Sequence, residues 1–420
     1  MEGKKFVGIC SDDGSRAVVN ANPWEQRKLI EVCDYVDYRG KTPTKTENGI
    51  FLVTAKNVKD GFIDYETSKE YISENAYEEV MRRGKPEIGD VLITTEAPCG
   101  NVAQVNKADI ALAQRIIKYR GHIGVVDNTY LKYYLLSPEF QKILNAKSSG
   151  GTVQGIKGSI LHQQKIIYPS YEEQKKIGQH MDSLDHLITL HQRKCDEVKS
   201  LKKYMLQKMF PQNEQKVPEI RFEGFTEAWE QRKLGDLVDR VTRKNQDLVS
   251  ELPLTISAQY GLIDQNEFFD KRVASKDVSG YYLIENGEFA YNKSTSTDAP
   301  WGAIKRLDRY ENGVLSTLYI VFGIKENNPV DSDFLVSYYS TNLWHKGIHE
   351  IAAEGARNHG LLNIAPADFF ETKLMIPQDI EEQKKIGKYF EELERLITLH
   401  QQKCEELKKI KKFMLQKMFV

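Results

Sequence analysis

The seven residues Glu172-Glu-Gln-Lys-Lys-Ile-Gly178 recur unchanged as Glu381-Glu-Gln-Lys-Lys-Ile-Gly387, at an offset of 209. They open two 39-residue segments, 172–210 and 381–419, which are identical at 26 positions when aligned without a gap. Chance does not produce identity of this extent. The chain therefore contains an internal duplication, and that duplication decides how the rest of it is organised.

A shorter repeat marks where each unit begins. Trp24-Glu-Gln-Arg-Lys-Leu29 recurs as Trp229-Glu-Gln-Arg-Lys-Leu234, at an offset of 205. Between the opening and closing repeats lie 142 residues (30–171) in the first unit and 146 residues (235–380) in the second, and these two stretches do not align convincingly. The sequence thus predicts two units with a common frame and different contents.

The closing segments have the periodicity of helices that bury one narrow seam. Their apolar residues alternate three and four positions apart over about four heptads, and Pro211 follows the first segment as a stop. This spacing favours a coiled coil in which the two segments pair with each other. The seam residues are Ile177, Met181, Leu184, Ile188, Cys195, Val198, Met205 and Met209 in the first segment, and Ile386, Phe390, Leu393, Ile397, Cys404, Leu407, Met414 and Met418 in the second.

Four polar residues interrupt the seam at equivalent positions of the two segments. His191 and His400 share one position, and Lys202 and Lys411 share the other. We expect these residues to set the register of the pair, as buried polar residues do in other coiled coils, and not to bind a ligand.

The duplication also predicts the direction of the helix pair. If a pseudo-twofold axis relates the units, the first helix leads from the first variable domain to the start of the second unit, and the second helix leads back. The two helices must then be antiparallel and the chain nearly circular. At about 1.5 Å per residue, each helix would be roughly 58 Å long.

The variable stretches have mixed strand and helix patterns. In the first, strands are predicted at 51–55, 91–95 and 101–105, and helices at 69–83 and 129–146. In the second, strands are predicted at 289–291, 303–304 and 318–322, and a helix at 331–351 that is capped at Asp331 or Ser332. We therefore expect two α/β (α+β) domains separated by an antiparallel two-helix coiled coil.

These patterns divide the chain into six parts. We expect a poorly ordered extension at 1–23, a first variable domain at 24–171, a first spacer helix at 172–210, a linker at 211–228, a second variable domain at 229–380 and a second spacer helix at 381–420.

Composition narrows the classes of protein further. The 59 Lys+Arg and 60 Asp+Glu give a net charge of −1, so any nucleic-acid surface must arise from local sorting of charge. Cysteines number five and none is spaced CxxC, which fits reduced cytoplasmic thiols better than disulfides or zinc. We interpret Cys195 and Cys404 as small core residues of the seam. The sequence has no run of about 18 apolar residues, so we expect no membrane span.

The usual catalytic motifs do not occur in this sequence. It has no Asp/Asn-Pro-Pro-aromatic tetrapeptide of adenine methyltransferases, and Ile156 stands where a P-loop needs its lysine. Asp368, Glu371 and Lys373 crudely match a nuclease motif, but they belong to one short segment. Three histidines offer one i,i+4 pair without a further nearby metal ligand: His345, His349 and His359. We therefore predict neither a catalytic residue nor a metal site.

Polar and basic residues in loops and at predicted strand ends remain as candidates for a DNA contact. Arg and Lys can address guanine, Asn and Gln adenine, while Ser, Thr and Lys hold phosphates. Each cluster alone is typical of a solvated loop, and it gains weight only because two such domains share one rigid spacer. The candidates are Lys41, Thr42, Lys45, Lys56, Asn57, Thr94, Thr95, Gln114 and Arg115 in the first domain, and Gln259, Tyr260, Asn292, Lys293, Ser294, Lys305, Arg306, Arg357, Asn358 and His359 in the second.

Three motifs recur in a fixed order over residues 24–419. These are the Trp-Glu-Gln-Arg-Lys-Leu opening, a Glu-Glu-Gln-Lys-Lys-Ile helix start shortly after Pro169 and Pro377, and a Leu-Gln-Lys-Met-Phe helix end. In this order they resemble the DNA-specificity subunit of type I restriction-modification systems. The segment Val217-Pro-Glu-Ile-Arg-Phe-Glu-Gly-Phe225 also looks like the usual opening of a unit in that family, and it has no counterpart before Trp24.

The resemblance implies a non-catalytic subunit whose variable domains are target recognition domains. Each would read one half of a bipartite, asymmetric site in double-stranded DNA, and the two half-sites would differ because the domains do not align. The paired helices would set the unread spacer and dock two modification subunits, which carry the S-adenosylmethionine chemistry. Two restriction subunits, which are motor-nucleases using ATP and magnesium, would complete a cytoplasmic complex. We expect weak DNA binding by the chain alone and tighter, salt-sensitive binding in the complex.

Two other functions fit parts of the pattern. A stand-alone tandem-domain DNA-binding regulator would not co-purify with a methyltransferase. A self-sufficient nuclease or methylase would be active alone with magnesium or S-adenosylmethionine.

Overall fold

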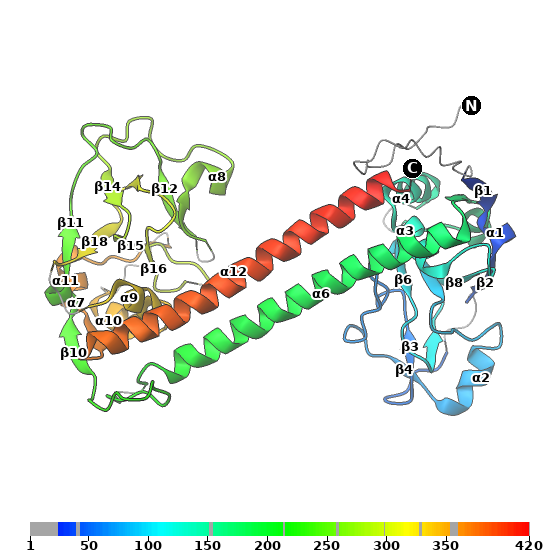
Figure 1. The fold of residues 1–420 in the computed structure, drawn as a ribbon, viewed down its shortest axis with the longest axis horizontal. Coiled ribbons are helices and arrows are strands. Elements are labelled where there is room, and N and C mark those ends of the chain that lie inside the picture. Colours follow the sequence, from blue (N-terminus) through cyan, green and yellow to red (C-terminus); the bar gives the residue numbers. More distant parts are fainter. Residues whose placement is uncertain are drawn as a thin grey trace, which may run out of the picture. The chain divides into compact units, whose positions relative to one another are not determined.

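The computed structural model describes residues 24–38, 43–150, 154–212, 215–257, 260–297, 299–326, 330–352 and 360–419. The chain divides into two compact units, one formed by Met1–Gln192 with Gln402–Val420 and the other by Arg193–Gln401. The two longest helices, α6 (Tyr171–Lys208) and α12 (Ile380–Lys417), each contribute one part to either unit (Figure 1). The helices predicted at the two closing repeats are thus confirmed. The extension expected at 1–23 lies outside the described residues.

In the first unit, the start of α6 packs against the end of α12. The Lys411 ammonium pairs with Asp185, and the Cys404 thiol lies 3.9 Å from the carbonyl oxygen of Ile188. Residue numbers fall along α12 as they rise along α6, so the two segments run antiparallel. Their contact buries Met181 completely and leaves Leu407 only 6% exposed.

The second unit repeats this packing with the roles of the helices exchanged. Lys202 pairs with Glu394, and the Cys195 thiol lies 3.9 Å from the carbonyl oxygen of Ile397. Both cysteines are buried at 2% exposure, which confirms their interpretation as small core residues. The predicted polar seam residues Lys202 and Lys411 therefore make one interhelical ion pair in each unit.

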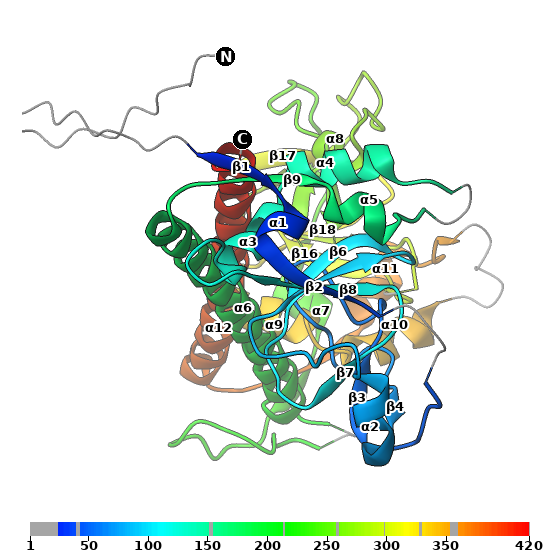
Figure 2. The ribbon, with the colours of Figure 1, turned by 90° about the vertical axis from the view of Figure 1, so that its right-hand side faces the viewer.

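The rest of the first unit is a layered α+β domain. Strand β1 (Glu25–Lys28) pairs antiparallel with β9 (Lys165–Tyr168). A four-stranded antiparallel sheet has the order β2 (Cys33–Asp37), β8 (Ile116–Gly121), β5 (Val91–Thr95), β6 (Cys99–Gln104). A smaller sheet has the order β4 (Tyr71–Ile72), β3 (Ile50–Val53), β7 (Ile110–Leu112), with β3 and β7 parallel. The small sheet lies at one end of the unit and the β1–β9 pair at the other (Figures 1 and 2).

Short helices and one 3-10 turn connect the strands of the first unit. They are α1 (Leu29–Val32), the 3-10 turn η1 (Glu74–Ala76), α2 (Tyr77–Val80), α3 (Asn128–Leu136), α4 (Pro138–Lys147) and α5 (Gly158–His162). The apolar core between sheet and helices includes Tyr119, Tyr130 and Phe140, and it continues onto α6 through Met181. The long helix is therefore part of the hydrophobic core of the domain.

The second unit contains the same kinds of element. Strand β10 (Glu230–Lys233) pairs with β19 (Lys373–Ile376), and a four-stranded sheet has the order β11 (Val238–Val241), β18 (Ile320–Ile324), β15 (Phe289–Asn292), β16 (Ala303–Arg306). Two further strand pairs are β12 (Leu254–Ser257) with β13 (Gly261–Asp264) and β14 (Tyr282–Glu285) with β17 (Asn312–Leu315). The helices are α7 (Leu234–Leu237), α8 (Gln265–Phe269), α9 (Ser332–Tyr339), α10 (Trp344–Ile351) and α11 (Pro366–Glu371).

The two units share one topology although their sequences do not align. In each four-stranded sheet, the strand that follows the short first helix pairs with the strand that comes last in the sequence. That strand in turn pairs with a hairpin, β5–β6 or β15–β16, whose second strand forms the edge of the sheet. Two consecutive helices, α3 and α4 or α9 and α10, then precede the final strand and the long helix. The two mixed helix–sheet domains expected from the sequence are therefore present.

Several predicted elements are shorter than expected. The helix predicted at 129–146 is two helices, because Ser137 caps α4 through the Phe140 N–H and Pro138 occupies its first turn. The helix predicted at 331–351 begins after its Asp331 cap as expected, but it breaks between Tyr339 and Trp344. The prediction of a helix over 69–83 is wrong for most of its length, because Tyr71–Ile72 is a strand that pairs with β3. Among the described residues, no helix is both long and apolar enough to cross a membrane.

The segment that opens the second unit is anchored on the first turn of α12. Arg221 makes two hydrogen bonds to the Glu382 carboxylate, from Nε at 2.6 Å and from the terminal nitrogen at 2.8 Å. The Glu382 side chain is 1% exposed, so this bidentate ion pair is buried. The equivalent residue of the first unit, Glu173, is exposed.

This difference between two equivalent glutamates predicts a difference in stability. Glu382→Ala should lower the free energy of unfolding by about 3–5 kcal/mol, because it leaves Arg221 without its partner in a buried pair. The matched control, Glu173→Ala, should change it by less than about 0.5 kcal/mol. Chemical denaturation followed by circular dichroism measures both. Equal losses for the two variants would contradict the assignment.

Candidate nucleic-acid interface

In both units, the turn of the hairpin in the four-stranded sheet, β5–β6 or β15–β16, lies beside the loop that precedes the last short helix, α5 or α11. In the first unit, Glu96 bridges to Gly155, and the Ile156 N–H donates to the Thr95 carbonyl over 2.9 Å. In the second, Ser294 bridges to Leu361, and the Leu362 N–H donates to the Lys293 carbonyl over 2.9 Å. We call these two places the first and the second hairpin site. They are defined by Thr95, Glu96, Gln114, Arg115 and Gly155, and by Asn292, Lys293, Ser294, Thr295 and Gly360.

The first hairpin site holds an arginine at its rim. The Arg115 carbonyl accepts the Thr95 N–H over 2.9 Å, which fixes the backbone of Arg115 beside the end of β5. Its guanidinium Nε lies 3.2 Å from a carboxylate oxygen of Glu96, and the arginine side chain is 48% exposed. Because the backbone of Arg115 is fixed and its exposed guanidinium is paired with one carboxylate, the guanidinium is able to exchange that carboxylate for a phosphate or a base edge.

The second hairpin site is built from small polar residues and one lysine. The Asn292 amide oxygen accepts the Ser294 N–H over 3.0 Å, and the Thr295 hydroxyl donates to the Gly360 carbonyl over 3.1 Å. The Lys293 ammonium lies 3.4 Å from the carbonyl oxygen of Ile364, and burial lowers the pKa of this lysine below its usual value. The side chains therefore differ from those of the first hairpin site although the backbone plan is the same.

Five of the predicted DNA-contacting residues lie at these sites, two at the first and three at the second. Gln114 is next to Arg115 in the sequence at the first site. Thr95 and Arg115 meet in the first unit, and Asn292, Lys293 and Ser294 meet in the second. The sequence analysis did not select Glu96 or Thr295, which complete the sites. Glu96 directly follows the predicted strand 91–95, and Thr295 directly follows the selected residues 292–294; these positions are their only sequence signal.

Asn57 and Thr94 have internal roles, and we leave them out of the candidate interface. Both are 0% exposed. The Asn57 amide accepts the Thr54 N–H over 2.9 Å and donates to carbonyl oxygens of a neighbouring loop, and the Thr94 hydroxyl accepts the Asn101 N–H over 3.0 Å. Buried polar atoms that are already hydrogen-bonded cannot reach a DNA base without loss of those bonds.

Five other predicted residues lie away from the hairpin sites. Lys45 pairs with Glu70 over 2.8 Å, and Lys56 is exposed in the loop after β3. Lys305 sits at the other end of β16 and faces the long helices, where burial, and then repulsion by Lys202, lowers its pKa.

Arg306 is bound by two carboxylates of its own domain. Its guanidinium lies 2.6 Å from Asp308 and 2.7 Å from Asp333.

Tyr260 is 54% exposed, at the turn between β12 and β13. The remaining predictions lie outside the described residues: Lys41, Thr42, Gln259, Arg357, Asn358 and His359.

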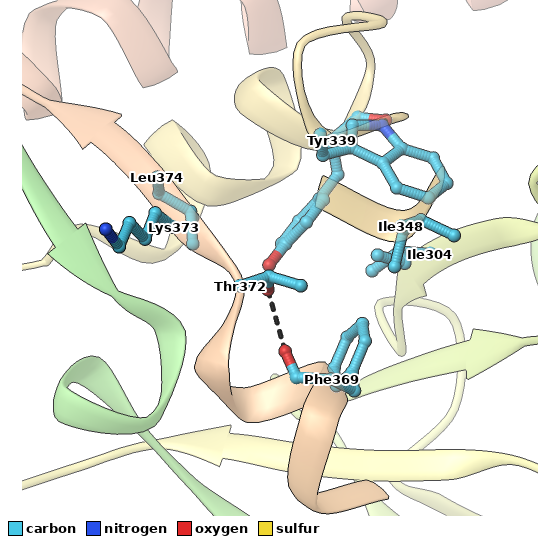
Figure 3. Close-up of a pocket in the computed structure, with 8 residues that line it drawn as sticks. Ile304, Tyr339, Ile348, Phe369, Thr372, Lys373 and Leu374 are labelled. Carbon is cyan, nitrogen blue, oxygen red and sulfur yellow. Dashed lines mark hydrogen bonds between the residues drawn. The ribbon is translucent and has the colours of Figure 1, made fainter. Parts of the chain in front are cut away.

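A small pocket in the second unit is lined mainly by apolar and aromatic side chains (Figure 3). Its lining includes no carboxylate, thiol or imidazole, and consists of Ile304, Tyr339, Trp344, Ile348, Phe369, Thr372, Lys373 and Leu374. The Thr372 hydroxyl donates to the Phe369 carbonyl over 2.7 Å, as the dashed line shows. Among the described residues, no group of three or more His, Cys, Asp and Glu is arranged to hold a metal ion.

Comparisons with known proteins agree on one family. The sequence profile described as "Type I restriction modification DNA specificity domain" matches residues 21–200 and 226–409. The MjaVIII type I restriction enzyme specificity subunit of Methanocaldococcus jannaschii is 27% identical over 195 residues, which is 44% of each chain. The MjaIX specificity subunit of the same organism is 27% identical over 227 residues, 51% of each chain. The matches thus span about half the length of these relatives.

One solved structure has the same fold over nearly the whole chain. The S subunit of a type I restriction-modification system from M. genitalium superposes with a TM-score of 0.62 at 14% sequence identity, covering 97% of this chain and 98% of that one. Identity is low and coverage is high, so the likeness concerns the arrangement of elements and not the residues of the hairpin sites.

The first hairpin site predicts that Arg115 contributes to DNA affinity. Arg115→Ala should weaken binding to the cognate site by about 1–3 kcal/mol, because it removes an exposed guanidinium. Arg27→Ala is the matched control, since Arg27 is also exposed and paired with a glutamate, Glu25, but lies on β1. Fluorescence anisotropy at two salt concentrations measures both. Similar losses for both variants would show that the effect is one of general charge.

Proposed function

The chain belongs to the type I restriction-modification DNA specificity family, and from that premise we propose that it is the non-catalytic DNA-recognition subunit of a type I restriction-modification complex. One observation carries the proposal. The chain contains the same domain plan twice, with each copy built onto both long helices, and the two copies differ in the side chains of their hairpin sites.

We propose that the domains at 24–171 and 229–380 are target recognition domains that read different half-sites. The first hairpin site presents an arginine–glutamate pair, which suits a guanine edge or a phosphate. The second presents an asparagine, a lysine and hydroxyl groups on the same backbone plan, a set that suits different bases. A bipartite and asymmetric DNA site follows from this difference.

We further propose that α6 and α12 form an antiparallel coiled coil that sets the unread spacer, with a pseudo-twofold relation between the units. Each helix has 38 residues, which corresponds to roughly 57 Å. Half-sites read from one face of the duplex lie about 34–36 Å apart, within that reach. Two linked modules bind more tightly than either alone only when the spacing of the half-sites fits, so a stiff helix pair makes spacer length part of the specificity.

The outer faces of the long helices carry a second apolar stripe that supports the docking of partners. Positions 187, 190, 201 and 204 of α6 are Leu, Leu, Leu and Tyr, and the equivalent positions 396, 399, 410 and 413 of α12 are Leu, Leu, Ile and Phe. Most of them are exposed, with Tyr204 at 48% and Phe413 at 60%. The named positions share one heptad register but are 3, 11 and 3 residues apart, because Lys194 and Glu197 occupy the heptad between them in α6. Each long helix thus carries two exposed apolar pairs, and such pairs suit the docking of another helix.

Because each unit contains one set of these exposed positions, we propose that two copies of one partner dock. These would be the modification subunits, which carry the S-adenosylmethionine chemistry, and two restriction subunits using ATP and magnesium would join them in the cytoplasm. The DNA clamp would be complete only in the complex, which accounts for the nearly neutral charge of this chain. Co-purification with a methyltransferase separates this proposal from a stand-alone DNA-binding regulator.

Exchange of one recognition domain tests the proposal as a whole. Replacing residues 30–171 by the equivalent stretch of another family member should change one half-site and leave the other half-site and the spacer unchanged. Long-read mapping of methylated adenines, in cells that carry the exchanged chain and its modification partner, shows which bases changed. A change in both half-sites would contradict two independently reading domains.

The apolar stripe predicts the stoichiometry of the complex. Tyr204→Glu or Phe413→Glu should each reduce the bound modification subunits from two to one, and the double variant should bind none, because a buried aromatic contact contributes about 2 kcal/mol or more. Gln207→Glu, one turn further along α6 and also exposed, adds the same charge outside the stripe and should retain two. Native mass spectrometry counts the subunits. Two bound copies in the double variant would overturn the docking surface.

A further inference from the structure

The start of α6 is tied to its own domain by one buried glutamine. Gln174 is 0% exposed, and its amide nitrogen donates to the carbonyl oxygens of Pro169 and Val125, both over 2.9 Å. Its amide oxygen accepts the Asp127 N–H over 2.9 Å. Asp127 in turn caps α3 by accepting the Tyr130 N–H over 2.9 Å. One side chain thus links the long helix to the first turn of the domain helix.

A glycine one turn further on brings the two helices into backbone contact. A Cβ atom at Gly178 would lie 3.1 Å from the Tyr130 nitrogen and 3.2 Å from the Thr129 side chain. A side chain at this position would force α3 away from α6 by a few tenths of an ångström. Gln174 and Gly178 together therefore form a tight joint between helix and domain.

The second unit has the same joint. Gln383 is 0% exposed, donates to the Pro377 carbonyl over 2.8 Å and accepts the Asp331 N–H over 2.9 Å. Asp331 caps α9 through the Phe334 N–H over 2.9 Å, and a Cβ atom at Gly387 would lie 2.7 Å from that nitrogen. Two domains whose sequences do not align are thus fastened by identical residues in identical roles.

The surroundings of the joint are specific to each unit. In the first, the Tyr133 hydroxyl of α3 lies 2.8 Å from Asp182 and 2.7 Å from Asp185 of α6. In the second, Ser337 occupies the equivalent place on α9 and donates to the carbonyl of Asp333 in its own helix. The shared element is therefore the glutamine and the glycine, and the polar contacts beside them vary with the domain.

A small rotation at such a joint moves the far end of a domain by a distance that matters to DNA. Over a lever of about 30 Å, the diameter of a domain of this size, a turn of about 7° shifts the far edge by roughly 3.4 Å, the rise of one base pair. Helix length alone cannot hold the spacing of two half-sites to one base pair if the domains pivot on their helices.

We propose that the two glutamine–glycine joints are positioning elements that fix the orientation of each recognition domain and so restrict the complex to one spacer length. The inference rests on the proposed function. Gln174, Gly178, Gln383 and Gly387 touch no DNA base in this mechanism, and they act through α3 and α9. The Glu-Glu-Gln-Lys-Lys-Ile-Gly motif is thereby explained as a joint at the start of each long helix.

A variant that loosens one joint should let the complex methylate sites with more than one spacer length, while the bases recognised in each half-site stay the same. Gln174→Ala removes three hydrogen bonds. In the complete complex with its modification partner, this variant should lose about tenfold of the discrimination between the cognate spacer and spacers one base pair longer or shorter, equivalent to about 1.4 kcal/mol. The measurement is long-read methylation sequencing of a plasmid library in which the half-sites are fixed and the spacer length varies.

Gly178→Ala is the second variant, because it crowds the first turn of α3 while it retains the Gln174 side chain. Gln179→Ala, exposed on the same helix, and Gly347→Ala, whose Cβ would meet Thr372 at an ordinary 3.5 Å, are the matched controls and should keep the wild-type profile. Thermal melting and partner binding verify that each variant is folded.

Broader spacer acceptance with unchanged half-sites in Gln174→Ala or Gly178→Ala supports the joint. An unchanged spacer profile in both folded variants overturns it and leaves the proposed function standing. Absence of bipartite methylation by the wild-type complex would overturn the proposed function, and the joint with it.

Discussion

Packing of α6 against α12 is the constraint on which the rest of the structure depends. In each unit the start of one helix and the end of the other bury a common seam and exchange one ion pair, Lys411 with Asp185 or Lys202 with Glu394. Long polar helices are stabilised mainly by such packing and not by their intrinsic propensity. The hydrophobic core of each domain extends onto this seam, so the domains and the helix pair stabilise one another.

Within each unit, the residues that recur between the units and those that differ lie in separate places. The seam, the joint and the β1–β9 or β10–β19 pair use residues that recur between the units, such as Gln174 and Gln383. The hairpin sites use residues that do not recur. This separation allows the side chains at a hairpin site to change without disturbing the helix seam.

The sequence predicted the frame well because the frame is repetitive. Identity at 26 of 39 aligned positions and the three-and-four spacing located both long helices and their buried seam. The common domain plan was not predicted, because a fold depends on the pattern of burial and tolerates different side chains. The break at Ser137-Pro138 within the helix predicted at 129–146 was missed, because the periodic pattern of apolar residues continues across it. At the candidate site, Thr95 and Arg115 were both selected from the sequence, but their contact was not predicted, and the burial of Asn57 and Thr94 likewise arises from tertiary contacts that periodicity does not encode.

Shared helices have a consequence for how this chain is made. The first unit needs the end of α12, so its seam at Leu184 stays uncovered on the ribosome until Leu407 has been synthesised, 407 − 184 = 223 residues later. At about 5–20 residues per second, that interval is roughly 10–45 s. During that interval the apolar seam of α6 in the nascent chain is exposed. The first unit, although synthesised first, is completed only when the end of α12 has been made.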